Sequence, residues 1–320
     1  MKKVFITGIS GFAGSHLAEY LLSKKEYDVS GTYLLEESVK RNLGTIKNNL
    51  DLIRVDLINN KKVFEIIKSV KPDYVFHLAA LPYTGTSFKA PFLTMKNNIA
   101  SQMNILSAIK DNNLFNTKIL VVSSGEIYGL IEKKDLPIDE ETKFMPTSPY
   151  SVSKITQDFM GLQYFLSYKL KVIRVRPFNH IGPRQSPSFV VSSIAKSIAE
   201  IEKGKRKPVI SVGNLSAKRD FTDVRDMVNA YTLAIEKGKI GEVYNIGSGR
   251  SYRISEVLEN LLKLSKIKIK IRVNKNLLRP VDIPELLCDA TKFKKITNWK
   301  PKIDMSTTLK DTLDYWRMIV

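Results

Sequence analysis

Short apolar runs alternate with longer amphipathic stretches through the first half of the chain. Strands buried on both faces of a parallel sheet read as such runs, and the stretches between them read as helices that cover the sheet. The predicted strands are residues 3–7, 29–33, 52–55, 74–78, 119–123 and 172–175, and the predicted helices are residues 15–24, 61–68, 92–111 and 150–168. This alternation predicts an α/β protein with a doubly wound parallel sheet of the Rossmann type.

The rhythm changes after Pro177, where glycine and proline mark loops around a predicted helix at 189–203. A strand-like run at 243–246 is placed to return to the sheet, and the remainder mixes short elements with proline-marked turns. We therefore predict two interleaved units. The Rossmann domain comprises residues 1–176 and about 219–248, and a smaller substrate-binding lobe comprises residues 177–218 and 249–320.

Composition points to a globular protein, because the 320 residues are 43% hydrophobic and 26% charged. No apolar run reaches the ~18 residues that would cross a bilayer. A strand-like run follows Lys2 and Lys3 at once, unlike a secretory signal. The only cysteine, Cys288, excludes an intrachain disulfide. Together these features favour a cytoplasmic location.

The net charge of +19 raises the question of nucleic-acid binding. The lysines are scattered along the chain and are not gathered with aromatic residues into one tract. We therefore predict no nucleic-acid partner. A positive field would instead help to attract an anionic nucleotide ligand.

Three glycines, Gly8, Gly11 and Gly14, lie with Phe12 and Ala13 between the first predicted strand and the first predicted helix. Glycines in this setting allow a tight turn and a close approach of the backbone to a pyrophosphate, which the helix N-terminus then binds. The loop predicts a dinucleotide cofactor, NAD or NADP. The second strand ends without the acidic residue that favours NAD and without the arginine that favours NADP, so the preference stays open.

Tyr150 and Lys154 are four residues apart at the start of a predicted helix and therefore share one face. A phenol titrates at about 10 and needs a neighbouring cation to exchange a proton near neutral pH. Lys154 supplies that cation, and Ser124, which follows the fifth predicted strand, can hydrogen-bond the same substrate oxygen. These residues predict an oxidoreductase site.

These motifs, together with residues 77–80 and 123–129, resemble the extended short-chain dehydrogenase/reductases over nearly the whole chain. In that family a tyrosine exchanges a proton with a sugar oxygen while hydride moves to or from the nicotinamide. A lysine lowers the pKa of the tyrosine and holds the nicotinamide ribose. The resemblance implies these roles for Tyr150 and Lys154, with Ser124 beside them. It also implies a cofactor site formed by Gly8, Gly11, Phe12, Ala13, Gly14, Asp56, Leu57, Leu78, Ala79, Ala80, Tyr150, Lys154 and Pro177, although Asp56 could equally be a simple turn residue.

Residues 176–187, 212–226, 278–284 and 298–301 look like the GDP-sugar branch of this family. They most resemble the GDP-4-keto-6-deoxy-mannose reductases, which make GDP-rhamnose with NAD(P)H. Arginine can bind a diphosphate in bidentate fashion, although each arginine could instead tie loops together. The implied substrate ligands are Ser87, Asn179, Arg184, Arg219 and Arg279. The loop 81–87 is unusual for the family and leaves open whether the sugar is a hexose or a heptose.

The alternative function is that of a GDP-mannose 4,6-dehydratase, or another dehydratase or epimerase of nucleotide sugars, with tightly bound NAD(P). A dehydratase removes a proton from C5, so it needs a carboxylate base beside the tyrosine. Glu126 stands where dehydratases of the family carry that base, and reductases often keep a glutamate there too. The preceding Gly125 and the missing arginines after the second strand disfavour the dehydratase.

Relatives commonly form homodimers through a four-helix bundle, which implies a homodimer here. Apolar positions on two predicted helices could form this bundle or could be buried against the sheet: Ile99, Met103 and Leu106 on one, and Phe159, Leu162, Phe165 and Leu166 on the other. The histidines His16, His77 and His180 lack the spacing of zinc ligands, so we predict no metal site.

Overall fold

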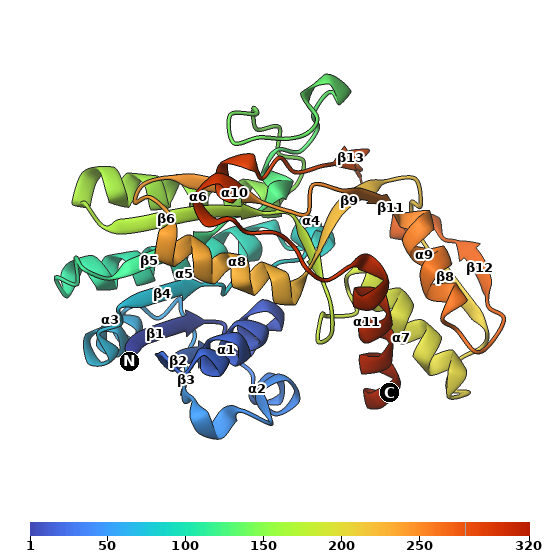
Figure 1. The fold of residues 1–320 in the computed structure, drawn as a ribbon, viewed down its shortest axis with the longest axis horizontal. Coiled ribbons are helices and arrows are strands. Elements are labelled where there is room, and N and C mark those ends of the chain that lie inside the picture. The colour runs from blue at the N-terminus through green and yellow to red at the C-terminus, as the bar shows by residue number, and fades with distance from the viewer. Residues whose placement is uncertain (279) are drawn as a thin grey trace.

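A central sheet of seven parallel strands runs through the computed structural model, which describes residues 1–278 and 280–320 (Figure 1). The strand order is β10-β6-β5-β4-β1-β2-β3, so the order reverses between β1 and β4. Ligands of doubly wound sheets bind at such a switch point, beyond the carboxyl ends of the strands. The strands are β1 (Lys2–Thr7), β2 (Tyr27–Tyr33), β3 (Asp51–Arg54), β4 (Tyr74–His77), β5 (Lys118–Val122), β6 (Lys171–Pro177) and β10 (Val243–Ile246).

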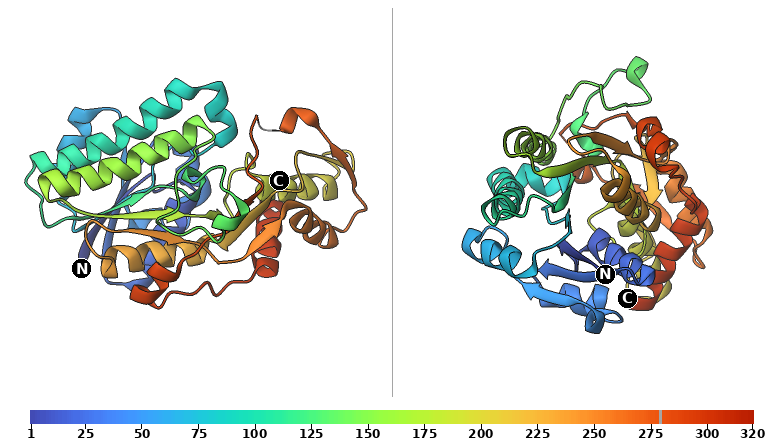
Figure 2. Two further views of the ribbon diagram at one scale, coloured as in Figure 1. Left: turned by 90° about the horizontal axis from the view of Figure 1, so that it is seen from above. Right: turned by 60° about the vertical axis from the view of Figure 1, so that its left-hand side comes forward.

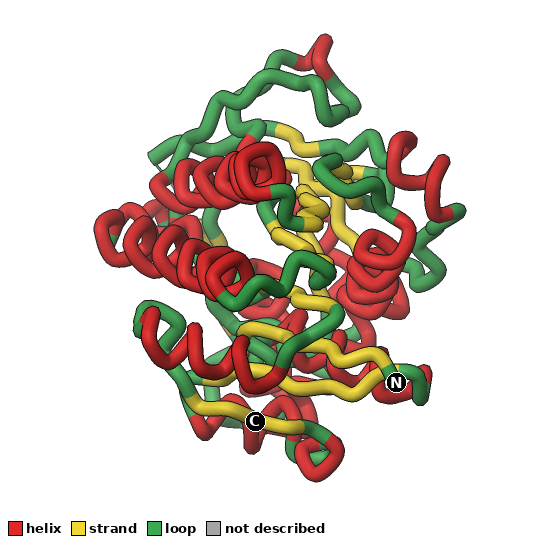
Figure 3. Tube along the Cα trace, turned by 90° about the vertical axis from the view of Figure 1, so that its left-hand side faces the viewer, coloured by secondary structure: helices red, strands yellow, loops and turns green. Residues whose placement is uncertain are grey.

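Helices cover both faces of this sheet (Figures 2 and 3). One layer contains α1 (Phe12–Lys24), α2 (Glu36–Leu43), α8 (Val224–Lys237) and α10 (Thr291–Thr297), and the other contains α3 (Asn60–Val70), α5 (Pro91–Asp111) and α6 (Pro149–Tyr168). Along β1 the side chains alternate between the layers, because successive residues of a strand point to opposite faces. Val4 and Ile6 belong to the core under α1 and α8, and Phe5 belongs to the core under α3 and α5.

The second lobe is built on two small sheets beyond the carboxyl end of the central one (Figure 1). In the first, β9 (Lys218–Asp223) pairs with β7 (Asn179–Ile181), β11 (Ser251–Arg253) and β13 (Glu285–Leu286). In the second, β8 (Val209–Val212) pairs with β12 (Lys270–Val273). Helices α7 (Val190–Glu202), α9 (Ile254–Lys263) and α11 (Met305–Ile319) pack together to form its core. The short elements of the chain are α4 (Thr84–Lys89), η1 (Lys47–Asn49), η2 (Gly125–Ile127), η3 (Lys133–Asp135) and η4 (Lys275–Leu277).

The predicted doubly wound fold is confirmed, and each predicted strand is present with ends shifted by at most two residues. Part of the predicted substrate lobe, from α10 to the segment just after it, packs on the central sheet instead. Phe293 and Trp299 are buried in the core of the central sheet with α8. Trp316, in contrast, packs in the core of the second lobe. The chain therefore crosses back to the first unit before α11 returns it to the second.

Helix α5 is the longest of the described helices at 21 residues, and its buried face includes the polar side chains of Asn98 and Gln102. A helix that crosses a bilayer must be apolar over about 20 residues. Within residues 1–278 and 280–320, no helix combines the length and the apolar character that crossing a membrane requires.

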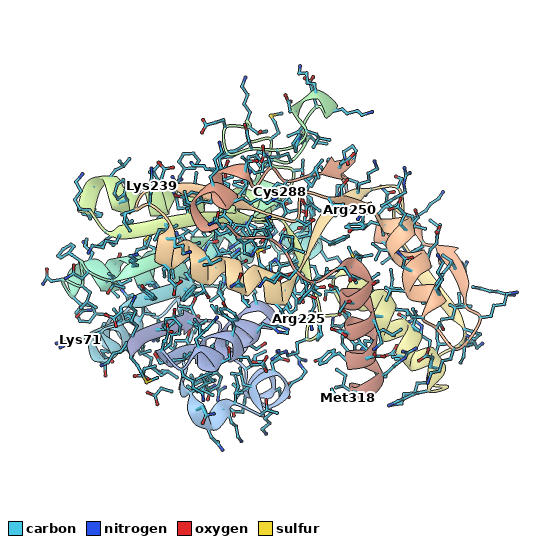
Figure 4. All side chains as sticks on the ribbon, in the orientation of Figure 1. Lys71, Arg225, Lys239, Arg250, Cys288 and Met318 are labelled. Atoms are coloured by element: carbon cyan, nitrogen blue, oxygen red, sulfur yellow. The ribbon has the colours of Figure 1, made fainter. Side chains whose placement is uncertain are left out.

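Asp220 of β9 is fully buried and joins the two lobes. One carboxylate oxygen accepts hydrogen bonds from the backbone N–H of Ser248 at 2.9 Å and from its hydroxyl at 2.6 Å. The other accepts from the backbone N–H groups of Gly249 at 2.9 Å and of Cys288 at 3.1 Å. Figure 4 labels Cys288, which lies where the chain leaves β13. Since Ser248 and Gly249 connect β10 of the central sheet to β11 of the lobe, this carboxylate fixes the crossing between them.

The substitution Asp220→Asn is expected to lower the free energy of unfolding by about 3 kcal/mol, because an amide cannot accept from all four donors of this buried carboxylate. Asp304→Asn is the matched control, because Asp304 is an exposed N-cap of α11 and asparagine caps helices equally well. Urea denaturation of the two variants measures the difference. Equal stability of both variants would contradict the role of Asp220.

Candidate active site

The carboxyl ends of β1, β4, β5 and β6 lie side by side, because these four strands are neighbours in a parallel sheet. Each is followed by residues that the sequence singled out: Gly8 after β1, Leu78 after β4, Ser123 and Ser124 after β5, and Pro177 at the end of β6. Helix α6 lies over β5 and β6 and brings Tyr150 and Lys154 to the same edge. The fold thus gathers the predicted cofactor and catalytic residues, although they come from distant parts of the chain.

The glycine loop has the geometry that a dinucleotide requires. Gly8 adopts a φ of 69°, and a Cβ on Gly14 would lie 2.2 Å from the carbonyl oxygen of Gly8. Gly11 precedes α1, whose first turn contains no acidic residue and is capped by no side chain. The N–H groups of this turn can therefore bind a pyrophosphate. The residues present fit NAD or NADP.

Thr7 connects the glycine loop to the segment after β4, a role that sequence reasoning missed. Its hydroxyl oxygen accepts from the backbone N–H groups of Leu78 and Ala79, both at 3.1 Å, and lies 3.0 Å from Nδ1 of His77. Burial lowers the pKa of His77 to about 3, so this imidazole is neutral. The only sequence signal was a polar residue at the end of an apolar run. Thr7 holds two of the predicted cofactor segments at a fixed separation.

Asn98 was also missed, because a lone asparagine inside a helix carries no motif. It is fully buried on α5. Its Oδ1 accepts from the backbone N–H of Leu81 at 2.7 Å, and its Nδ2 donates to the hydroxyl of Ser153 at 2.9 Å. Asn98 therefore ties the loop after Ala80 to the helix that carries Tyr150.

Phe12 and the segment after β7 close one side of the glycine loop. The ring of Phe12 stacks on His180 with 5.7 Å between centroids and 8° between planes. Nearby, Arg184 donates to the Glu19 carboxylate at 2.5 and 3.0 Å and to the carbonyl oxygen of Asn42 at 3.0 Å. Both terminal nitrogens of this guanidinium are therefore engaged by α1 and α2, which favours the alternative that Arg184 ties loops together.

Asp56 is exposed, and its Oδ1 accepts from the backbone N–H of Ile58 at 3.0 Å. This is the local hydrogen bond of an Asx turn, as in the alternative that the sequence left open. Leu57 is buried, and its carbonyl oxygen accepts from Nδ2 of Asn104 at 2.7 Å. The cofactor contacts of Asp56 and Leu57 stay predictions.

Tyr150 lies in the first turn of α6, and a capping box formed by Ser148 and Ser151 fixes where this helix begins. The Tyr150 phenol is buried and hydrogen-bonded to Ser124. Burial raises the pKa of Tyr150, the hydrogen bond from Ser124 opposes that rise, and the charge of Glu126 adds to it. The phenol is therefore protonated near neutral pH and is ready to act as a proton donor.

Lys154 is 5% exposed, and its Nζ donates to the carbonyl oxygen of Val122 at 2.8 Å. Burial lowers its pKa from 10.5 to about 7, because the charged ammonium is less well solvated inside the protein. Lys154 lies one helical turn beyond Tyr150, where its charge can stabilise the phenolate that proton donation leaves behind.

Glu126 lies in η2, two residues after Ser124, and its backbone N–H donates to the Ser124 hydroxyl oxygen at 3.1 Å. Its side chain is close enough to Tyr150 for its charge to affect the phenol. A Cβ on the intervening Gly125 would lie 2.9 Å from the ring of Phe178. No side chain can therefore stand between Ser124 and Glu126 unless Phe178 moves.

The predicted substrate residues, unlike the catalytic ones, are spread over separate parts of the structure. Asn179 begins β7, next to the carboxyl end of β6. Ser87 is fully buried, and its hydroxyl donates to the carbonyl oxygen of Thr84 at 2.7 Å. Arg219 donates to the carbonyl oxygen of Ile283 at 2.8 Å and to the Asp282 carboxylate at 3.2 Å. The fifth residue, Arg279, lies outside the described residues. Their substrate contacts stay predictions.

The three histidines make different contacts. His16 and His180 pack around Phe12, and His77 contacts Thr7. In the described part of the chain, no group of three histidine, cysteine, aspartate or glutamate side chains could hold a metal ion.

A family model described as GDP-mannose 4,6 dehydratase matches residues 5–312. GDP-6-deoxy-D-mannose reductase of Pseudomonas aeruginosa is 31% identical over 315 residues, which cover 98% of this chain and 97% of that protein. Human GDP-mannose 4,6 dehydratase is 30% identical over 335 residues, which cover 96% of this chain and 89% of the human one.

Solved structures of enzymes that act on nucleotide sugars have a similar fold. The structure of RMD from Pseudomonas aeruginosa complexed with NADPH has a TM-score of 0.86 at 30% identity and covers 100% of both chains. UDP-glucose 4-epimerase of Thermus thermophilus complexed with NAD has a TM-score of 0.88 at 26% identity, and covers 99% of this chain and 100% of that one.

The substitution Lys154→Met is expected to stabilise the protein at about pH 6 by about 2 kcal/mol, because it removes a buried charge. Below pH 7 the folded and unfolded states both bind the proton, and the folded state bears the cost of the buried ammonium. Above the folded pKa of about 7 and up to 10.5, only the unfolded state binds it, so wild-type stability rises with pH.

Urea midpoints of wild type and Lys154→Met across this range, without added cofactor, are the measurement. The advantage of the variant should shrink toward about pH 9.5. A difference that does not change with pH would show that Lys154 titrates normally.

Proposed function

Because the chain belongs to the GDP-mannose 4,6-dehydratase family of extended short-chain dehydrogenase/reductases, we propose that it is a GDP-4-keto-6-deoxy-D-mannose reductase. The product is GDP-D-rhamnose, and the cofactor is NADH or NADPH. The observation that carries the proposal is that Gly125 packs against the ring of Phe178, in a chain of which 98% matches a reductase.

The reduction needs one proton donor beside the keto oxygen, and the site provides it. Bound at the carboxyl edge of the sheet between the glycine loop and α6, a reduced nicotinamide would supply the hydride to C4. Tyr150 donates its proton to O4, and Ser124 hydrogen-bonds the same oxygen. Lys154, one turn away, stabilises the resulting phenolate and holds the nicotinamide ribose. Burial raises the pKa of Tyr150 and so keeps the phenol protonated, which means that the proton to be donated is present near neutral pH.

The sugar nucleotide is proposed to lie between the carboxyl edge of the sheet and the second lobe. Asn179 is well placed to donate to it, since β7 continues directly from β6 at this edge. Arg219 and Arg279 stay the proposed diphosphate ligands, and Ser87 a proposed sugar contact. The cytoplasmic location is proposed on the sequence alone.

A 4,6-dehydratase is the second candidate, because Glu126 is buried beside Tyr150 and the family model itself carries that description. Dehydration needs a base for the C5 proton and an acid for the departing C6 hydroxyl. Glu126 could be the base. Gly125 offers no side chain as the acid, which favours the reductase.

The deciding assay supplies the purified protein with GDP-mannose, and separately with GDP-4-keto-6-deoxy-mannose plus NADH or NADPH. Absorbance of the reduced cofactor and product analysis are followed together. Oxidation only with the keto sugar supports the reductase and determines the cofactor preference. Conversion of GDP-mannose without net change in the cofactor would establish the dehydratase instead.

Two substitutions separate the same candidates at the residue level. Tyr150→Phe is expected to lower kcat for the keto sugar by about 10³-fold, because the proton donor is lost. Glu126→Gln should leave that kcat within about threefold, because reduction requires no base at this position. If Glu126→Gln abolished turnover of GDP-mannose, Glu126 would be the base of a dehydratase.

A homodimer is also proposed. Helices α5 and α6 pack side by side on the outside of the molecule (Figure 2). Of the predicted bundle positions, Met103, Phe159 and Leu166 are exposed, whereas Leu106 is buried in the core beneath α5. Exposed apolar residues on adjacent helices are suited to pack against a second copy of the same surface.

Sedimentation is expected to give twice the chain mass of 36.3 kDa for the wild type. Phe159→Glu should halve the mass, because a carboxylate cannot be buried in an apolar bundle without a partner. Leu277→Glu, an equally exposed position on the second lobe, is the control and should stay dimeric. A monomeric wild type would refute the bundle.

A further inference from the structure

A third polar residue shares the face of α6 that carries Tyr150 and Lys154. Asp158 follows Lys154 by one helical turn and is completely buried. Its carboxylate accepts from a terminal nitrogen of Arg174 at 2.6 Å and from Nε of Arg176 at 2.8 Å. Both arginines belong to β6, and their side chains are 7% and 4% exposed. The proposed reaction assigns no task to this buried cluster.

The Arg176 branch leads to the catalytic segment after β5. Arg176 donates to the Tyr128 hydroxyl at 2.9 Å, and that hydroxyl donates to Oδ1 of Asn245 at 2.7 Å. Tyr128 is fully buried and comes directly after η2, the turn that contains Glu126 and is capped by Ser124. Asp158, Arg176 and Tyr128 therefore form an unbroken chain of hydrogen bonds between the helix of Tyr150 and the segment of Ser124.

The Arg174 branch leads in the opposite direction. Arg174 donates to the carbonyl oxygen of Gly241 at 3.0 Å, just before β10 begins. In a parallel sheet the amino end of β10 lies opposite the carboxyl edge where Ser124 and Tyr150 meet. Arg174 thus shares the carboxylate and the burial of Arg176 but makes none of its contacts with the catalytic segment.

Asp158 is placed to hold α6 at a second point, two turns beyond the capping box, where it can do what the cap cannot. The capping box at Ser148 determines where α6 begins. Rotation of the helix about its axis is instead resisted by side chains farther along it, among them Ser153, which accepts from Asn98, and Asp158. A rotation of about 10° moves a phenol oxygen, which stands far from the axis, by more than ~1 Å. A displacement of that size at a reacting atom can cost about 10²-fold in rate. Asp158, two turns from Tyr150, is placed to prevent it.

We propose that Asp158, acting through Arg176 and Tyr128, is a positioning residue that holds the Tyr150 hydroxyl against Ser124 and thereby sets the rate of proton transfer. It contacts neither substrate nor cofactor in this role. The kinetic part of the test rests on the proposed function, whereas the spectroscopic part does not.

Removing Asp158 itself would leave two buried guanidinium groups without a counter-charge and would endanger folding. The test therefore uses Tyr128→Phe, which deletes one hydroxyl, and Arg176→Lys, which keeps the charge but loses the forked geometry. Arg174→Lys is the matched control, since it makes the same change in the other arm of the same cluster. Urea denaturation first establishes that all three variants fold.

Tyr128→Phe and Arg176→Lys are expected to lower kcat by about 10²-fold while KM changes by less than about threefold, because no binding contact is removed. Arg174→Lys should keep the wild-type kcat even if it lowers stability as much as Arg176→Lys. The double variant Tyr128→Phe/Arg176→Lys should lose no more than the larger single loss, because both act in one chain.

The second readout needs no turnover. In protein labelled with ¹³C on the tyrosine ζ carbon, the Tyr150 signal is identified by its loss in Tyr150→Phe. We expect this signal to move in Tyr128→Phe and Arg176→Lys, because the hydrogen bond from Ser124 is disturbed, and to stay in place in Arg174→Lys.

An unchanged Tyr150 signal and an unchanged kcat in Tyr128→Phe and Arg176→Lys would overturn the proposal. Equal losses in all three variants, in proportion to stability, would also overturn it and leave the cluster a purely structural one. If the wild type turns over neither GDP sugar, the proposed function fails, and the Tyr150 signal alone decides on Asp158.

Discussion

The parallel hydrogen bonding of β6, β5, β4 and β1 is the constraint on which the site depends. Parallel strands end on the same edge, so whatever follows each strand is delivered to one place regardless of distance along the chain. The glycine loop, the segment after β4 and the Ser124 segment meet for this reason. Helix α6 then adds Tyr150 and Lys154 from above that edge. No contact between these groups is needed to bring them together, only to adjust their final geometry.

That final adjustment is made by buried polar groups, each of which is satisfied by another. Thr7 joins two cofactor segments, Asn98 joins the loop after β4 to α6, and Asp158 joins α6 to β6. A buried polar group without a partner is costly, so every such pair tolerates only one arrangement of the elements that carry it. The apolar core supplies cohesion between the layers, whereas these pairs determine how the layers align at the reacting atoms.

The same burial determines the chemistry of the site. Burial raises the pKa of the Tyr150 phenol, which keeps it protonated, and lowers the pKa of the Lys154 ammonium to about 7. The second lobe is held to this edge by Asp220 and by Arg225, which α8 presents to Asp311 of α11 (Figure 4). Since β9 of the lobe runs directly into α8, movement of the lobe is coupled to the layer that supports the central sheet.

The sequence by itself determined the alternation of strands and helices, and it predicted the glycine loop and the Tyr150 and Lys154 pair, because each depends on local periodicity or short spacing. Ser124 joined this predicted set by its place after the fifth strand. The sequence did not reveal the tasks of Thr7, Asn98 and Asp158, whose partners are 16 to 72 residues away. It also offered Arg184 as a substrate ligand, while the structure engages that guanidinium with Glu19, 165 residues earlier. Only tertiary structure decides such pairings, because a lone polar residue has the same sequence signal whether it meets a ligand, a partner or water.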